Sequence, residues 1–299
     1  MPIRQLATLF LLLLISPALT AAQPLVDGGW LAANLGKPDL LVLDLQPKPA
    51  YQQYHVPGAI HSDYGSWRRT DAKSVPQMLP PVKELEQLIG GLGIDNTTQV
   101  VLVVTGRSAG EMASATRVYW TFKALGHDNV SILDGGLVAY AQDRSHPLEN
   151  RVNQPVGKTF KAHPRAEYLV RTEQVKDALD RNIRLVDNRS SAEHMGLVSG
   201  KKERPGTIPG AVNLPFDWLT VNRGATFHTP ENLKRIYQAA GVPLDGEQIS
   251  FCHTGHRTSL AWFVSHELLG NDKAQLYDGS TAEWAANPSL PLEQKIRLN

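Results

Sequence analysis

The stretch LLVLDLQ, residues 40–46, is a short apolar run that ends on Asp44, and the same run recurs as IRLVDNR at residues 183–189. Three more blocks recur in the same order in the two halves of the chain: HVPGAIH (55–61) with TIPGAVN (207–213), LGIDNTTQVVLVV (92–104) with AGVPLDGEQISFC (240–252), and VSILDGG (130–136) with AQLYDGS (274–280). Matching blocks in one order indicate a duplicated unit. We therefore expect two tandem units, each long enough to hold its own core.

The pattern inside each unit predicts the fold class. Short Val, Ile and Leu runs read as buried strands at residues 100–104 and 248–251, and longer patterns read as helices at residues 114–125 and 258–269. Strands that alternate with helices favour a parallel sheet covered on both faces. We therefore predict an α/β chain with two tandem domains, each a mainly parallel sheet flanked by helices.

The first residues have the plan of a secretory signal peptide, which we place at residues 1–22. A charged start is followed by an apolar run over residues 6–15, and small residues then lead to Ala22, after which we expect cleavage. A retained membrane anchor is the alternative, but the run is short for a span and Pro17 interrupts it. The leader predicts a periplasmic or secreted protein with no stable membrane insertion after cleavage.

The repeated blocks also set the domain boundaries. We predict unit 1 at residues 23–150 and unit 2 at residues 164–299, with the polar segment 151–163 as a linker between them. The net charge of the 299 residues is only +1 at pH 7. No broad basic surface is therefore expected, and a nucleic-acid partner is not indicated.

Cys252 is the only cysteine of the chain, so it cannot form a disulfide within it. In an exported protein such a residue is buried and inert, paired with another molecule, or reactive. It follows the strand at 248–251, and Gly255 lies in the short loop before the helix that opens at Thr258. The N–H groups of such a loop, the helix dipole and the charge of Arg257 favour an anion and lower a thiol pKa. The pattern predicts a reactive thiolate.

The two histidines of this loop carry a weaker signal. His253 and His256 could assist proton transfer or only tune the local charge. Together with Cys252 they form a Cys-His-x-x-His spacing that is not typical of zinc sites, and no second ligand cluster stands out. We therefore expect no metal at this loop.

Three motifs in order resemble those of the tandem-domain rhodanese, or sulfurtransferase, family over essentially the whole mature chain: YQQYHVPGAI (51–60), CHTGHRT (252–258) and AQLYDGSTAEW (274–284). The third departs from the family at Thr281. The resemblance implies that Cys252 takes the outer sulfur of a small donor such as thiosulfate, becomes a persulfide and passes the sulfur to a thiophilic acceptor, without a cofactor.

The same resemblance assigns roles to the rest of the loop and to unit 1. The donor and the persulfide would be bound by His253, Thr254, Gly255, His256, Arg257 and Thr258. Unit 1 has VVTGRSAGE (103–111) where unit 2 has the cysteine loop, and this segment contains no thiol. The resemblance therefore makes unit 1 a non-catalytic partner that shapes the cleft.

Departures from the family pattern leave the donor open. The thiosulfate enzymes carry a basic pair after the cysteine, where this chain has His253 and Thr254, and the loop fits the mercaptopyruvate enzymes only in part. Glu193 stands where two-domain members have an arginine that holds the donor, and a carboxylate there would repel thiosulfate. Arg189 is a candidate substitute. In one interpretation Arg189, next to Asp187, lies near the loop and binds the donor. In the other, Arg189 and Asp187 form only a structural ion pair.

Two other functions stay open at this point. A phosphatase of the Cys-x5-Arg type needs five residues between cysteine and arginine, whereas four separate Cys252 from Arg257. A rhodanese-like protein that docks a partner or senses oxidants through Cys252, without turnover, is the main alternative.

Three tryptophans and one insertion complete the expectations. We assign Trp218 and Trp262 to the core, and Trp284 either to the core or to the wall of the cleft. The segment KKERPG (201–206) belongs to an insertion that is found only in unit 2. It reads as a solvated loop that could form a rim of the cleft.

Overall fold

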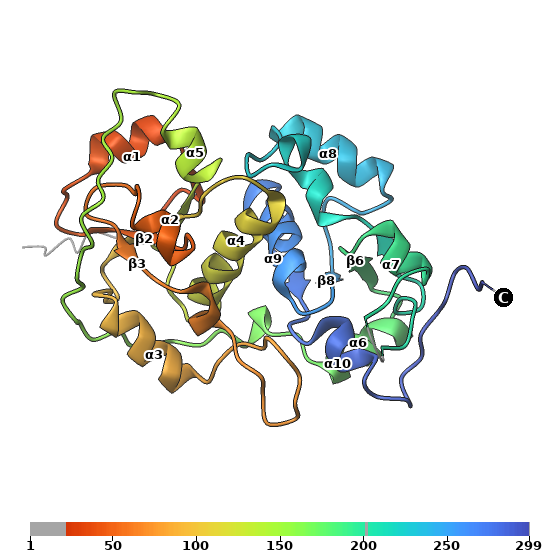
Figure 1. Cartoon of the computed structure of the whole chain (residues 1–299). Coiled ribbons are helices and arrows are strands. Elements are labelled where there is room, and N and C mark those ends of the chain that lie inside the picture. The colour runs from red at the N-terminus through yellow and green to blue at the C-terminus, as the bar shows by residue number, and fades with distance from the viewer. Residues whose placement is uncertain (1–21, 201–202, 299) are drawn as a thin grey trace, which may run out of the picture.

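The computed structural model describes residues 22–200 and 203–298, so the predicted signal peptide lies almost wholly outside the described residues. Figure 1 shows two α/β lobes, one built from each half of the chain, with helices around each sheet. The prediction of an α/β chain with two parallel sheets is confirmed. None of the helices in the described residues combines the length and the apolar character that a membrane crossing requires.

Unit 1 is built on a five-stranded sheet of order β1-β5-β4-β2-β3, in which every neighbouring pair is parallel. Its strands are β1 (Leu25–Val26), β2 (Leu40–Asp44), β3 (Ile60–His61), β4 (Gln99–Val103) and β5 (Val130–Leu133). Its helices are α1 (Gly28–Asn34), α2 (Lys48–Tyr51), the 3-10 helix η1 (Tyr64–Trp67), α3 (Val82–Gly91), α4 (Ala109–Ala124) and α5 (Gly136–Tyr140). The Val and Leu run of β4 is buried, as a strand with both faces covered requires.

Unit 2 repeats the plan with a four-stranded parallel sheet of order β7-β6-β8-β9. Its strands are β6 (Arg184–Asp187), β7 (Val212–Asn213), β8 (Gln248–Phe251) and β9 (Ala274–Leu276). Its α-helices are α6 (Thr172–Asp180), α7 (Ser191–Met195), α8 (Pro230–Ala239), α9 (His256–Phe263) and α10 (Ser280–Trp284). Shorter helical turns are η2 (Ala166–Tyr168), η3 (Phe216–Leu219), η4 (Val221–Arg223) and η5 (Val264–Leu268).

The helices α4 and α9 lie side by side between the two sheets and join the units (Figure 1). Tyr119 of α4 and Leu260 and Phe263 of α9 belong to one apolar cluster that also includes strand residues of both sheets. Between the helices, Thr116 Oγ1 and Ser259 Oγ form a hydrogen bond of 3.0 Å. Full burial of each large apolar side chain contributes about 1.5–3 kcal/mol. The shared core therefore holds the two units in one arrangement.

The helix after β4 begins earlier than the sequence indicates. The apolar pattern predicts a start at residue 114, but α4 starts at Ala109. The cause is Ser108, whose hydroxyl accepts a hydrogen bond from the N–H of Glu111 at 3.2 Å and caps the helix. The apolar pattern alone does not indicate this earlier start, because Ser108 and the residues directly after it are small or polar.

The helix after β8 also differs from the predicted helix at 258–269. α9 begins at His256, directly after Gly255 in the left-handed conformation, so the first helical turn lies closer to Cys252 than expected. The second half of the predicted helix is not α-helical, because residues 264–268 form the π-helical turn η5.

The tryptophans separate into buried and exposed ones. Trp262 and Trp284 are buried, and each indole N–H donates to a backbone carbonyl, so the core assignment of Trp262 is confirmed. The core assignment of Trp218 is wrong, because this side chain is 44% exposed. Trp218 lies on the short helix η3, which buries the neighbouring Leu219 instead.

The segment between the sheets lies along unit 1 and contains no regular element over residues 151–163. The N–H of Lys158 donates to the carbonyl of Gly90 at 2.9 Å, and the Phe160 side chain joins the core. Gly90 allows this close crossing, because a Cβ there would lie 2.6 Å from the carbonyl oxygen of Lys158. The segment therefore packs against unit 1 and is bound to it along its length.

Candidate active site

Cys252 lies directly after β8, at the carboxyl end of an inner strand, where open α/β sheets place their sites. Its N–H donates to Ser280 Oγ at 3.1 Å, and its carbonyl accepts from the N–H of Thr281 at 3.1 Å. The residue is 1% exposed. The backbone of Cys252 is therefore held in place, and the residue is shielded from bulk solvent.

The loop after the cysteine depends on Gly255. Its φ is +71°, and a Cβ there would lie 2.5 Å from Nη1 of Arg117 and 2.8 Å from the carbonyl of Asp278. The N–H of Gly255 donates to Ser280 Oγ at 3.1 Å, as the N–H of Cys252 does. Because these two N–H groups already donate to Ser280, they are not available to an anion. An anion would instead be bound chiefly by the N–H groups of the first turn of α9, which have no acceptor within the helix.

Arg257 and Thr258 stand at the start of α9, and both are engaged. Nη1 and Nη2 of Arg257 donate to the two carboxylate oxygens of Glu193 in α7, at 2.7 and 2.8 Å. Thr258 is buried, and its hydroxyl donates to Asn188 Oδ1 at 2.8 Å. Thr258 therefore ties the helix start to the end of β6.

The pairing also bears on the expectation that Glu193 would repel an anionic donor, because it places an arginine against this carboxylate. Burial alone would raise the pKa of Glu193, but the hydrogen bonds and the charge of Arg257 lower it to about 2. Glu193 is therefore ionised and neutralised by its partner. The same pairing means that Arg257 is not a free cation.

Arg189 and Asp187 form a buried bridge at the end of β6. The guanidinium donates from Nε to Asp187 Oδ1 at 2.9 Å, and from Nη2 to Asp187 Oδ2 at 2.7 Å and to the carbonyl of Gly206 at 2.8 Å. Burial would raise the pKa of Asp187, whereas hydrogen bonds from His194 and Arg189 lower it to about 2. Of the two interpretations of this pair, the geometry favours the structural bridge, which ties Gly206 back to β6.

His256 faces unit 1. Its Nε2 lies 3.1 Å from the carbonyl of Gly110, which can only accept, so Nε2 carries the proton and Nδ1 accepts from the Tyr64 hydroxyl at 2.6 Å. Burial, and then the charges of Arg68 and Arg117, lower the pKa of His256 to about 3. The histidine is thus neutral and fixes the two units against each other.

We expect acid to destabilise the protein through His256. The pKa of this residue is about 3 in the folded protein and 6.5 in an unperturbed histidine, so between these values the unfolded chain binds the extra proton. The free energy of unfolding, measured by urea denaturation, should fall as pH drops from 6.5 towards 3 and should be unaffected by this group above 6.5.

The variant His256→Asn should flatten this pH dependence, whatever its effect at neutral pH. The exposed His163 offers a matched control, because His163→Asn should leave the slope as it is in the parent protein. An equal slope in His256→Asn and in the parent protein would show that the histidine is not held neutral.

His253 lies on the other side of the loop and faces the insertion of unit 2. Its Nε2 is 3.4 Å from Oε1 of Glu203. Lys201 and Lys202 of the same insertion lie outside the described residues. The contact places the end of the insertion beside the cysteine loop.

Side chains from distant parts of the chain, which sequence reasoning missed, complete the site. Arg68 donates from Nη2 to the carbonyl of Thr254 at 2.5 Å and to its hydroxyl at 3.1 Å. Arg117, which is fully buried, donates from Nη1 to the carbonyl of Gly255 at 3.2 Å and pairs through Nη2 with Asp278 at 2.5 Å. Both arginines belong to unit 1, so the loop of unit 2 is held from across the interface.

The loop of unit 1 shares a backbone hydrogen bond with the cysteine loop but has no thiol. Val104 follows β4, and its carbonyl accepts a hydrogen bond from the N–H of Leu137 at 2.9 Å. In unit 2, the carbonyl of Cys252 accepts in the same way from the N–H of Thr281. Glu111 Oε2 accepts from the N–H groups of Gly106 and Arg107 at 2.9 and 2.8 Å. A carboxylate of the chain itself therefore fills the anion-binding position of this loop.

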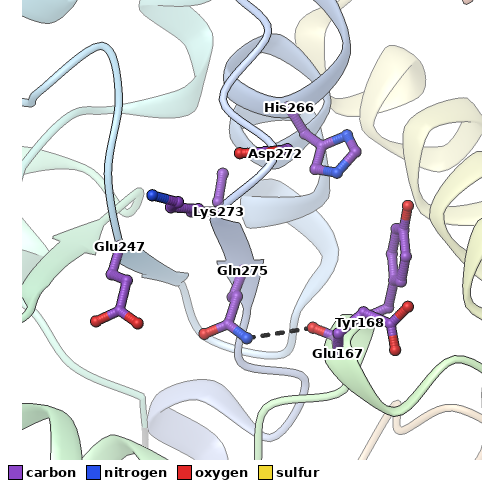
Figure 2. A pocket seen from close by; sticks show the side chains of 8 residues that line it. Glu167, Tyr168, Glu247, His266, Asp272, Lys273 and Gln275 are labelled. Atoms are coloured by element: carbon purple, nitrogen blue, oxygen red, sulfur yellow. Dashed lines mark hydrogen bonds between the residues drawn. The ribbon is translucent and has the colours of Figure 1, made fainter.

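Each unit has a cavity. One of about 490 Å³ adjoins the loop of unit 1 and is lined in part by Tyr64, Val104 and Glu111. The other, of about 230 Å³, lies at the amino ends of β8 and β9 (Figure 2). It is lined by Glu167, Tyr168, Glu247, His266, Asp272, Lys273, Ala274 and Gln275. This second cavity is at the opposite end of the sheet from Cys252 and takes no part in the site.

Comparison of the sequence with known proteins gives consistent matches along the chain. A family model described as "Rhodanese-like domain" matches residues 27–143 and 171–287. A Mycobacterium bovis protein named "Putative thiosulfate sulfurtransferase 1" is 31% identical over 278 residues, which are 90% of this chain and 97% of that protein. A Haloferax volcanii protein named "Putative thiosulfate sulfurtransferase" is 32% identical over 288 residues, 92% of this chain and 97% of that protein.

Solved structures agree with the sequence matches. SseA from Escherichia coli, described with the rhodanese fold and the mechanism of 3-mercaptopyruvate sulfotransferases, has a TM-score of 0.74 at 26% identity and covers 87% of this chain and 99% of its own. Wild-type EanB has a TM-score of 0.79 at 23% identity and covers 92% of this chain and 70% of its own. The second match supports the fold alone.

Proposed function

The chain belongs to the rhodanese family and is a sulfurtransferase, and on that premise we propose that Cys252 carries sulfur as a persulfide from a small anionic donor to a thiophilic acceptor. One observation carries the proposal: the thiol is fixed between the end of β8 and the first turn of α9. Open N–H groups and the helix dipole favour an anion at that place.

The proposed reaction has two displacement steps. The Cys252 thiolate attacks the outer sulfur of thiosulfate, a new S–S bond forms, and sulfite leaves with the electron pair of the broken S–S bond. The carbon of cyanide then attacks the outer sulfur of the persulfide, thiocyanate leaves, and the thiolate returns. With 3-mercaptopyruvate, the C–S bond of the donor breaks instead, and pyruvate leaves after it gains a proton. The cycle needs no metal, cofactor or added oxidant.

The setting of the thiol favours a sulfur carrier over the other candidate functions. Cys252 is 1% exposed, so an oxidant would reach it only through the same narrow approach as a sulfur donor. A persulfide in this position would be shielded from bulk solvent and oxidants. A phosphatase would need a free arginine for the phosphate, but Arg257 is occupied by Glu193.

Unit 1 is proposed as the non-catalytic partner of unit 2. Val104 stands at the position of the cysteine, and Glu111 occupies the N–H groups that would otherwise receive an anion. Unit 1 supports the loop of unit 2, because Arg68 and Arg117 both donate hydrogen bonds to it. We also propose export through the leader at residues 1–22, on the strength of its charged start and apolar run.

Sulfur loading tests the proposed function directly. We expect intact-mass analysis to show one added sulfur atom after treatment with thiosulfate or 3-mercaptopyruvate, and its loss after cyanide. The donor that loads at the lower concentration is the preferred one. If neither donor adds sulfur while a small alkylating reagent still modifies Cys252, the persulfide carrier is wrong and a docking or sensing role takes its place.

A further inference from the structure

Small sulfur donors are anions, so the site needs a cation that is free to meet them. Three arginines near the cysteine loop are already neutralised by carboxylates. Arg257 is paired with Glu193, Arg189 with Asp187, and Arg117 with Asp278. An arginine whose charge is already balanced by an adjacent carboxylate offers little attraction to a further anion. None of the three is therefore a suitable donor-binding group.

Arg68 differs from these three. It lies just after η1 in unit 1, and its guanidinium donates only to neutral oxygens, those of Gln77, Tyr64 and Thr254. In the part of the chain that the structure describes, no carboxylate oxygen lies within 4.0 Å of its nitrogens. The side chain is half-buried, so its charge is only partly hydrated. Such a group gains more than an exposed lysine or arginine would from meeting an anion.

The contacts of Arg68 place this charge at the cysteine loop. Its Nη2 donates to both oxygens of Thr254, two residues after the thiol. Its Nη1 lies 3.3 Å from the hydroxyl of Tyr64, which in turn donates to His256 on the other side of the loop. Burial lowers the pKa of Arg68, and a charge on Cys252 acts to raise it, which is consistent with a guanidinium close to the thiolate.

We propose that Arg68 of unit 1 binds the oxyanion of the sulfur donor, the sulfonate of thiosulfate or the carboxylate of 3-mercaptopyruvate, while the sulfur of the donor reaches Cys252. The proposal rests on the proposed function and assigns to unit 1 the donor-binding arginine that unit 2 lacks at Glu193. The donor class follows: a small molecule with a transferable sulfur at one end and an oxyanion at the other. Cyanide carries no oxyanion, so the acceptor step does not use this contact.

Binding of thiosulfate to Cys252→Ser protein tests the proposal without turnover. In this variant no sulfur can be transferred, and calorimetry reports the affinity for the donor alone. We expect Arg68→Gln in the same background to weaken thiosulfate binding about tenfold or more, because a charge-assisted hydrogen bond is lost. Arg68→Lys should keep part of the affinity. Arg69→Gln is the matched control, because the neighbouring Arg69 pairs with Glu84 on the surface, and it should bind as Cys252→Ser does.

Steady-state kinetics separate donor binding from a structural effect on the loop. In the protein with Cys252 intact, Arg68→Gln should raise the KM for thiosulfate about tenfold and leave the KM for cyanide unchanged. Equal losses in the donor and acceptor steps would mean that Arg68 only positions the loop and would overturn the proposal.

The calorimetric outcomes can also overturn it. Undiminished thiosulfate binding in Arg68→Gln, or no measurable binding to Cys252→Ser at all, would refute an oxyanion site at Arg68. Either result leaves the persulfide function standing if wild-type protein still loads sulfur. Failure of wild-type protein to load sulfur removes the persulfide function instead, while the calorimetry still reports whether the anion site exists.

Discussion

Sulfur transfer from thiosulfate to cyanide is expected to fall by about a thousandfold or more in Cys252→Ser, the loss typical of removing a nucleophile. A serine hydroxyl is not ionised at neutral pH and does not attack sulfane sulfur in place of a thiolate. The chain contains no second cysteine that could substitute for Cys252. The measurement is the rate of thiocyanate formation, with the mass of the protein followed in parallel to show that no sulfur is added.

The fold of this variant should be close to that of the parent protein. The hydrogen bonds that hold residue 252 are made by its backbone, to Ser280 and Thr281, and serine keeps them. The urea midpoint of Cys252→Ser is therefore the control for a folding defect. Turnover within tenfold of the parent rate would mean that the sulfur passes through some other group, and the assignment of Cys252 would fail.

Arg117→Met should strongly destabilise the protein. The guanidinium is fully buried between the units, pairs with Asp278, and donates to the carbonyl of Gly255. Removal of one partner of a buried ion pair leaves the other charge uncompensated and typically costs about 3–5 kcal/mol. The free energy of unfolding from urea denaturation measures the loss. Sulfur transfer should fall as well, because the turn after the cysteine loses its support.

A second substitution separates the charge effect from the loss of packing. In Arg117→Met with Asp278→Asn, the uncompensated carboxylate is gone, so the double variant should regain about half of the lost stability or more. Lys83→Met serves as the matched control, because Lys83 is exposed on α3, and such a change should shift stability by less than about 0.5 kcal/mol. If Arg117→Met unfolds within about 1 kcal/mol of the parent protein, the buried pair does not hold the units together.

The sequence allowed the fold to be predicted because the signals for it are local. The apolar runs before Asp44 and Asp187 and the continuous run of β4 are each only a few residues long, and each is recognisable without knowledge of the rest. Their repetition in the same order indicates two sheets. The place of Cys252 between a strand and a helix follows from the apolar run before it and from Gly255 after it.

The partners of the loop could not be predicted, because they depend on how the two units pack. Arg117 and Asp278 are 161 positions apart, and Arg68 and Thr254 are 186 apart. No local pattern marks either arginine as part of a site. The pairing of Glu193 could not be predicted for the same reason: its charge is visible in the sequence, but its pairing with Arg257 depends on the packing of α7 against α9.

Arg68 and Arg117, which connect unit 1 to the loop of unit 2, also bear on why both units are retained. The copy without a thiol now supports its neighbour, because Arg68 and Arg117 donate hydrogen bonds to the cysteine loop. A deletion of residues 23–150 would not restore a single-domain ancestor, because it would leave Gly255 and Asp278 without their support. Selection would therefore retain unit 1 together with unit 2, and the two units would be inherited as one functional gene.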